Sequence, residues 1–122
     1  MSLATLEPNP VWTPGTHEET VETLAEHEDL TYRVWGGDWC GDCRAQLPDF
    51  AAALEAAEVP DDRIHHHVVD QDKQGPDVEA YGIEYVPTVV VEADGTELAR
   101  FVESEPVPIA VFLAERIREH RS

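Results

Sequence analysis

Hydrophobic and polar residues follow two periods along this chain, and the changes between them divide it into helices and strands. Apolar residues at helical spacing, such as Leu47, Phe50 and Leu54, mark segments with one hydrophobic face. Short runs rich in β-branched and aromatic residues mark strands. In chain order, the pattern predicts helix 17–28, strand 30–35, helix 40–57, strand 63–69, helix 76–81, strands 87–93 and 97–102, and helix 107–120.

Three local signals indicate how some of these elements begin, bend and connect. Asp94-Gly95 separates the last two strands and is a strong hairpin signal, so these strands are expected to be antiparallel. The segment Thr16-His17-Glu18-Glu19 fits a capping box at the start of the first helix. Pro48 lies inside helix 40–57 and is expected to kink it, because proline has no N–H to donate.

The order of the elements predicts an α/β fold. Strands 30–35 and 63–69 are joined by a helix, so we expect them to be parallel with a right-handed crossover. With the antiparallel hairpin they form a central mixed β-sheet flanked by helices on both faces. Residues 16–122 are expected to form a single domain. Residues 1–15, which contain three prolines, are interpreted as an extended N-terminal arm with a short edge strand near Val11 and Trp12.

The net charge of the chain indicates which partners and which solvent conditions suit this protein. Its 122 residues include 26 acidic and 8 basic side chains, a formal net charge of −18, and Lys73 is the only lysine. Such an anionic surface opposes binding to nucleic acid and to anionic membranes. Self-repulsion of this size is tolerated where salt screens it, which favours a salt-loving source with a salt-filled cytosol. An ordinary acidic protein that docks basic partners is the alternative.

Length and composition favour one soluble domain. A hydrophobic content of 42% is enough for one core in a chain of this size. Residues 1–14 lack a basic region followed by a continuous apolar run, so we interpret them as neither a signal peptide nor a membrane anchor. The two cysteines are both used by one short motif, which leaves none for a secreted-type disulfide framework. We therefore expect a cytoplasmic, reducing compartment. We also expect the protein to be a monomer.

The two cysteines, Cys40 and Cys43, lie between a predicted strand and a predicted helix. A disulfide between them closes only a four-residue loop, so it removes little entropy from the unfolded chain and is a poor structural device. At the start of a helix, however, the first thiol lies beside unpaired N–H groups that favour its thiolate. The second thiol can then attack any mixed disulfide that the first one forms. The spacing therefore predicts redox chemistry.

Metal binding is the alternative interpretation of these cysteines. A structural zinc site normally needs two further Cys or His ligands at matching spacing, and the sequence has no second CxxC. Further candidate metal ligands are the histidines of the run His65-His66-His67. Alternate residues of a strand point to the same side, so His65 and His67 could chelate a metal ion together. Histidines on a sheet surface need no ligand, so we predict no metal and no bound cofactor. A metal-binding domain that uses Cys40, Cys43 and a histidine is the weakest of our three hypotheses.

From Leu30 to Val102 the chain resembles the thioredoxin family. The segment Trp39-Cys40-Gly41-Asp42-Cys43 carries the resemblance, and Tyr81-Gly82-Ile83 followed by Val86-Pro87-Thr88 supports it at a family-like separation. The resemblance implies the thioredoxin fold, a cis peptide bond before Pro87, and backbone hydrogen bonds from Val86 to an extended substrate. Cys40 and Cys43 are the expected catalytic residues. The expected substrate-binding residues are Trp39, Gly41, Asp42, Tyr85, Val86 and Pro87.

Three positions depart from the family pattern. Val34 stands where well-known thioredoxins have a buried acid that helps to move a proton from the second cysteine. Water, Asp38 or Asp42 would have to accept the proton of Cys43 instead. Asp42 replaces the usual proline between the cysteines, and its charge disfavours the Cys40 thiolate, which favours reduction of partners over oxidation. The segment Glu103-Ser104-Glu105 replaces a late glycine, which implies a more acidic and bulkier surface there.

The sequence therefore predicts a thiol-disulfide oxidoreductase that reduces protein disulfides through a Cys40/Cys43 dithiol-disulfide cycle. The expected partners are disulfide-containing protein substrates and a separate electron-donor reductase. The alternative is a thioredoxin-fold module for redox sensing or protein binding, with little turnover. The missing acid at Val34 and the acidic segment 103–105 favour this second hypothesis.

Overall fold

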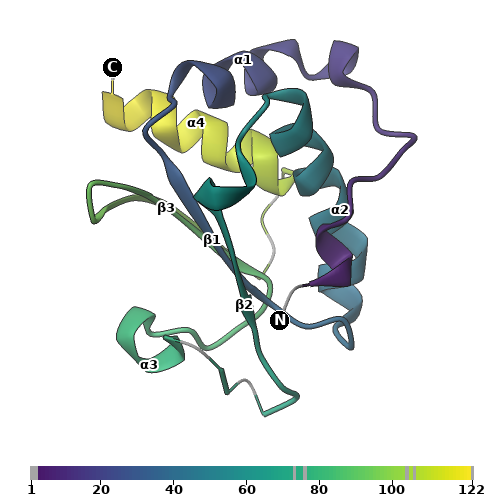
Figure 1. Ribbon diagram of the computed structural model, residues 1–122, viewed down its shortest axis with the longest axis vertical. Coiled ribbons are helices and arrows are strands. Elements are labelled where there is room, and N and C mark those ends of the chain that lie inside the picture. The colour runs from purple at the N-terminus through teal and green to yellow at the C-terminus, as the bar shows by residue number, and fades with distance from the viewer. Residues whose placement is uncertain (1–2, 73, 76, 104, 106, 122) are drawn as a thin grey trace.

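The computed structural model describes residues 3–72, 74–75, 77–103, 105 and 107–121. The helices are α1 (Glu18–Glu26), α2 (Gly41–Ala56), α3 (Val78–Tyr81) and α4 (Ile109–Arg121), and the strands are β1 (Thr31–Gly36), β2 (Ile64–Val68), β3 (Thr88–Ala93) and β4 (Thr96–Val102). Every predicted helix and strand from residue 17 onward is present, with ends that differ by a few residues (Figure 1). None of the helices in these described ranges is long and apolar enough to cross a membrane.

The four strands form one mixed sheet in the order β2-β1-β3-β4. β1 is parallel to β2, and β3 is antiparallel to β4, as the sequence predicts, and β3 is also antiparallel to β1. In the hairpin, Asp94 has φ 52° and Gly95 has φ 79°. Two consecutive positive φ angles are the signature of the tight turn that matches the twist of paired strands. The hairpin prediction is therefore confirmed.

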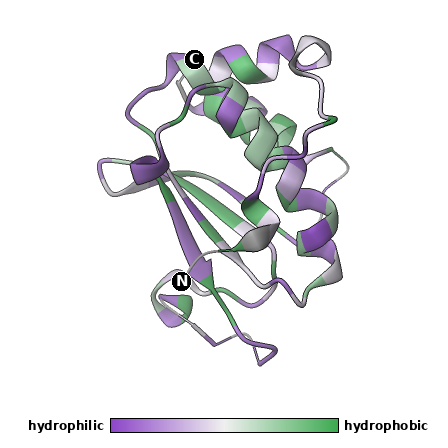
Figure 2. Ribbon diagram, turned by 45° about the vertical axis from the view of Figure 1, so that its right-hand side comes forward, coloured by the Kyte–Doolittle hydropathy of each residue, from purple (hydrophilic) through white to green (hydrophobic). Residues whose placement is uncertain are grey.

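One face of the sheet is covered by α2 and α4. The side chains of Tyr32, Val34 and Val89 on this face are at most 1% exposed, and the ring of Phe50 from α2 meets Tyr32 edge-on at 6.2 Å. Helix α1 packs outside, against α4, where the Arg118 guanidinium donates to the Thr23 hydroxyl at 2.7 Å. Figure 2 shows hydrophobic stretches on the central strands, mixed with hydrophilic ones, and on the helices beside them. The main core is thus a sandwich of sheet and helices.

The opposite face of the sheet carries α3, so helices lie on both faces as expected (Figure 1). The Tyr81 ring of α3 packs on Trp35 with ring centroids 4.8 Å apart, and its hydroxyl donates to Glu92 at 2.6 Å. Arg33 donates to the same carboxylate, also at 2.6 Å. This smaller layer is therefore held by aromatic stacking and hydrogen bonds as well as by burial.

The N-terminal segment differs from its prediction. Residues 10–12 form a turn and coil in place of the expected edge strand, and short 3₁₀ turns form at Ala4–Leu6 and Pro14–Thr16 where an extended arm was expected. The predicted capping box is also wrong. His17, and not Thr16, occupies the N-cap of α1 and makes no side-chain cap bond, and the Thr16 hydroxyl donates to the Thr13 carbonyl. Leu3 and Leu6 are buried in the main core, which accounts for the compact path.

Candidate active site

Cys40 and Cys43 lie at the N-terminal end of α2. Cys40 has extended backbone angles and is the N-cap residue, and its Sγ accepts a hydrogen bond from the Cys43 N–H at 3.3 Å. Its thiol also lies 3.8 Å from the Val86 carbonyl oxygen, to which it donates. The Cys40 sulfur therefore lies at the N-terminal end of the helix, where backbone N–H groups point toward it. The structure thus joins the two cysteines to the loop that precedes β3.

The two thiols differ in burial. Cys40 is 8% exposed, whereas Cys43 is fully buried. The pKa of Cys43 is raised to about 12, mainly by burial and further by the neighbouring Cys40 sulfur and the Asp42 charge. A hydrogen bond with the Gly37 backbone acts in the opposite direction and lowers it. Because the thiolate is the nucleophile, Cys40 is the cysteine that can attack first and Cys43 the one that must lose a proton later.

Two glycines make room for this site at the end of β1. A Cβ on Gly36 would lie 3.2 Å from Cys43 Sγ, and a Cβ on Gly37 would lie 2.1 Å from Nε1 of Trp39. That nitrogen donates to the Val69 carbonyl at 3.0 Å, which fixes the Trp39 ring beside the motif with 36% of the residue exposed. Trp39 is therefore anchored at its polar end and open on its apolar side.

The second wall of the site is the loop that enters β3. The Val86–Pro87 peptide bond is cis, as predicted, and both residues are buried. Tyr85 is 47% exposed, and its carbonyl accepts a hydrogen bond from the Thr88 hydroxyl. Gly41 and Asp42 are exposed at the start of α2. The residues predicted from sequence thus fall into two groups, with Trp39 to Cys43 on one side and Tyr85 to Pro87 on the other, linked by the contact between Cys40 and Val86.

The positions that depart from the family pattern also lie near the site. Val34 is fully buried in β1, on the face that α2 covers. Glu103 has φ 56°, a left-handed conformation that favours glycine, and its N–H donates to the Pro87 carbonyl at 2.8 Å. Ser104 lies outside the described residues. The backbone of Glu103 is thus hydrogen-bonded to the Pro87 loop, and the residue itself is exposed.

Sequence reasoning missed the participation of the N-terminal segment. The Thr5 N–H donates to the Asp38 carboxylate at 3.1 Å, and Leu3 is 2% exposed. The side chain of Leu3 reaches the space over Gly36 that Cys43 also borders. The available signal was the spacing of Leu3 and Leu6, which places two large apolar residues one helical turn apart before the prolines.

The histidine run lies on β2 with alternating environments. His65 is exposed, His66 accepts a hydrogen bond from the Leu3 N–H, and His67 is buried with its ring stacked on Trp35 at 4.3 Å. Burial lowers the pKa of both His66 and His67. Among the side chains that the structure describes, no group of three or more His, Cys, Asp or Glu is arranged to hold a metal ion.

The geometry by itself defines a class: a mixed α/β sheet with a helix N-terminus that carries two free thiols beside a cis-proline loop. The family model for thioredoxin matches residues 11–115. The chain therefore belongs to the thioredoxin family, as its sequence predicts. A comparison with curated protein sequences gives no significant match.

Solved structures agree with this assignment. Thioredoxin from Fasciola hepatica is 28% identical, with 82% of this chain and 90% of that chain covered and a TM-score of 0.53. A mutant thioredoxin from Halobacterium salinarum NRC-1 is 25% identical, with 100% and 97% covered and a TM-score of 0.52. Mitochondrial thioredoxin 3 from Saccharomyces cerevisiae, at 21% identity, 79% and 83% coverage and a TM-score of 0.53, supports the fold alone. This chain thus belongs to the general class of thiol-disulfide oxidoreductases.

Proposed function

We propose that this protein reduces disulfide bonds in other proteins by cycling Cys40 and Cys43 between a dithiol and a disulfide. The observation that carries the proposal is the asymmetry of the two thiols. Cys40 caps α2 and keeps 8% of its surface exposed, whereas Cys43 is fully buried with its N–H on the Cys40 sulfur. Disulfide exchange requires an attacking thiol that a partner can reach and a resolving thiol next to it, and the small exposure of Cys40 makes it the thiol for the first role.

The cycle balances without a bound cofactor. The Cys40 thiolate attacks one sulfur of the substrate disulfide, and the other substrate sulfur leaves as a thiolate that takes up a proton. Cys43 then gives up its proton and attacks Cys40 Sγ, which releases the second substrate thiol and leaves a Cys40–Cys43 disulfide. Two electrons have passed to the substrate. A separate reductase must return two electrons and two protons to restore the dithiol.

The proposed substrate surface surrounds Cys40. Trp39 and Tyr85 present exposed aromatic rings, and we expect an extended substrate segment to pair with the backbone of Val86, whose carbonyl accepts from the Cys40 thiol in the free protein. Gly41 and Asp42 complete the rim. Partly exposed aromatic side chains beside a reactive group suit transient contact with varied proteins. The partners are therefore disulfide-containing proteins and a reductase, with no nucleic acid and no membrane.

A second candidate is a redox-sensing or binding module with little turnover. The specific observation in its favour is the full burial of Cys43, which raises the pKa of its thiol to about 12, while Val34 occupies the place of the family's acid. A resolving thiol that holds its proton slows the second step of the cycle. In that case the mixed disulfide, or the oxidised state, would persist long enough to act as a signal.

We also propose a monomer that works in a reducing, salt-rich cytoplasm. The support is the net charge of −18 and the presence of two free cysteines, both within the redox motif. A surface with this charge repels itself at low ionic strength and is screened at molar salt. Activity should therefore be assayed at high salt.

The deciding experiment is the reduction of insulin disulfides at molar salt, with a small dithiol to recycle the protein. We expect multiple turnovers by the wild-type protein and loss of turnover in Cys43→Ser. In a parallel reaction without the small dithiol, which would itself resolve a mixed disulfide, we expect a trapped mixed disulfide in Cys43→Ser and none in Cys40→Ser. A folded wild-type protein that forms the mixed disulfide but does not turn over would reject the reductase and support the sensing module.

A further inference from the structure

Residues 3–9 form a strap that runs across the helical side of the molecule from β2 to α2. At one end, the Leu3 N–H donates to Nδ1 of His66 on β2 at 2.9 Å. At the other, the Asn9 side chain donates to Asp49 on α2 at 2.8 Å, and its backbone N–H donates to the Pro48 carbonyl at 3.1 Å. The strap is thus fixed at both ends by hydrogen bonds to different elements.

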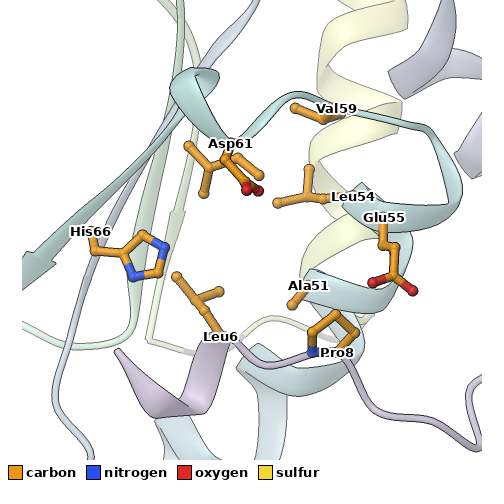
Figure 3. Close-up of a pocket in the computed structure, with 9 residues that line it drawn as sticks. Leu6, Pro8, Ala51, Leu54, Glu55, Val59, Asp61 and His66 are labelled. Atoms are coloured by element: carbon orange, nitrogen blue, oxygen red, sulfur yellow. The ribbon is translucent and has the colours of Figure 1, made fainter. Parts of the chain in front are cut away.

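Beneath the middle of the strap lies a pocket of about 290 Å³. Figure 3 shows Leu6 and Pro8 of the strap along one edge of this pocket and Val59 and Asp61 along the opposite edge. The pocket lies beside α2 but does not include Cys43 among its lining residues. Leu6 therefore borders an open space, and its environment differs from that of Leu3.

Leu3 reaches the buried side of the redox site. A Cβ built on Gly36 would lie 3.2 Å from Cys43 Sγ, 3.3 Å from Leu47 and 3.7 Å from Cδ1 of Leu3, so these three side chains gather around one point. Leu3 is 2% exposed and Cys43 is fully buried. Leu3 of the strap and Cys43 thus border the same small space over Gly36, and both are closed to solvent.

A third tie joins the strap to the loop that carries the redox motif. The Thr5 N–H donates to Oδ1 of Asp38, two residues before Cys40. The backbone carbonyl of Asp38 accepts from the Arg44 guanidinium in α2 at 2.8 Å. Asp38 therefore links the strap, the loop before Cys40 and the first turn of α2.

We propose that the strap closes the Cys43 side of the active site to water, with Leu3 as the positioning residue that covers the resolving thiol and Asp38 as its latch. The inference deepens the proposed function, since it concerns the resolving step. Cys43 must give up a proton before it attacks the mixed disulfide, and water is the acceptor that a closed strap keeps out. Displacement of the strap admits that water and lets the proton leave.

The test is the alkylation of Cys43 by iodoacetamide in a Cys40→Ser background, where it is the only thiol. We compare Leu3→Ala with the matched Leu6→Ala, at several pH values and molar salt. A decrease of one unit in the pKa of Cys43 raises its thiolate fraction about tenfold below that pKa. We expect an acceleration of that order in Leu3→Ala and a smaller one in Leu6→Ala. Equal rates in the two variants would overturn the assignment of Leu3.

A second pair of variants tests the latch on the surface, where folding is not at risk from a core cavity. Asp38→Asn and Asp38→Ala remove the same charge, but only the asparagine retains an oxygen that can accept from Thr5. We expect faster alkylation of Cys43 in Asp38→Ala than in Asp38→Asn. Equal rates would reject the latch. Because alkylation requires no turnover, failure of the strap and failure of the reductase in the insulin assay are distinguishable.

Discussion

The two faces of the sheet are held by different forces, and each supports one half of the active site. On the face under α2 and α4, the side chains of Tyr32, Val34 and Val89 are buried among apolar neighbours. On the face under α3, Glu92 receives hydrogen bonds from Arg33 and Tyr81. Apolar burial has no preferred direction, whereas a hydrogen-bonded carboxylate fixes its partners within a few tenths of an ångström.

The difference matters because the cysteines and the cis-proline loop come from opposite faces. Helix α2 carries Cys40 and Cys43 on the apolar face. Tyr81 on the polar face is the last residue of α3, and its carbonyl accepts from Arg100 at 2.8 Å just before the chain turns toward Pro87. The approach of Cys40 to Val86 therefore depends on both faces. Substitutions can be chosen that test each face separately.

The largest effect is expected from Phe50→Ala on the apolar face. Phe50 is 1% exposed and contacts Tyr32, so its truncation removes buried area and leaves a cavity that costs about 3–5 kcal/mol of the free energy of unfolding. Urea denaturation at molar salt measures the loss. Phe112→Ala is the matched control, because Phe112 is only partly buried. A loss no greater than that of the control would show that this face is not the main source of stability.

A smaller, pH-dependent effect is expected from Glu92→Gln on the polar face. Burial alone would raise the pKa of Glu92, but hydrogen bonds from Tyr81 and Arg33 and the Arg33 charge outweigh it and leave the pKa lowered. The unfolded chain therefore binds more protons at acid pH, so the contribution is complete at neutral pH and is lost as the pH falls through the folded-state pKa. We expect Glu92→Gln to cost about 1–3 kcal/mol at pH 7.

The measurement for Glu92 is a series of urea titrations from neutral pH to about pH 3. The variant should lose less stability than the wild-type protein over this range, because it lacks the titrating carboxylate. Glu97→Gln is the control, since Glu97 pairs with Arg100 at an exposed position where an ion pair contributes little. Parallel pH profiles for the wild-type protein and Glu92→Gln would contradict the role assigned to this carboxylate.

The same contrast explains what the sequence could predict. Helix spacing around Phe50, the Asp94-Gly95 turn and the CxxC motif are local signals, and each led to the observed element or site. The contact between Arg33 and Glu92 spans 59 positions, and the contact between Leu3 and His66 spans 63. No local pattern encodes such pairs. The failed capping box shows the reverse case, in which a local signal was overridden by the path of the N-terminal segment.

The smallest effect, and the sharpest test, comes from one substitution made on both faces. The Tyr32 hydroxyl is buried and has no hydrogen-bond partner among the described residues, and burial raises its pKa, with a further contribution from Asp29. The Tyr81 hydroxyl donates to Glu92. We expect Tyr32→Phe to increase the free energy of unfolding by about 1 kcal/mol, because it removes an unsatisfied polar group from the core.

Tyr81→Phe should instead decrease the free energy of unfolding by about the same amount, because it leaves a carboxylate that has lost a donor. Both variants delete a single oxygen from a tyrosine ring, so composition and side-chain size are matched. Urea titrations at one pH and one salt concentration are sufficient to compare them. If both substitutions decreased the free energy of unfolding equally, the Tyr32 hydroxyl would have to form a hydrogen bond in solution. The distinction between an apolar face and a hydrogen-bonded face of the sheet would then be wrong.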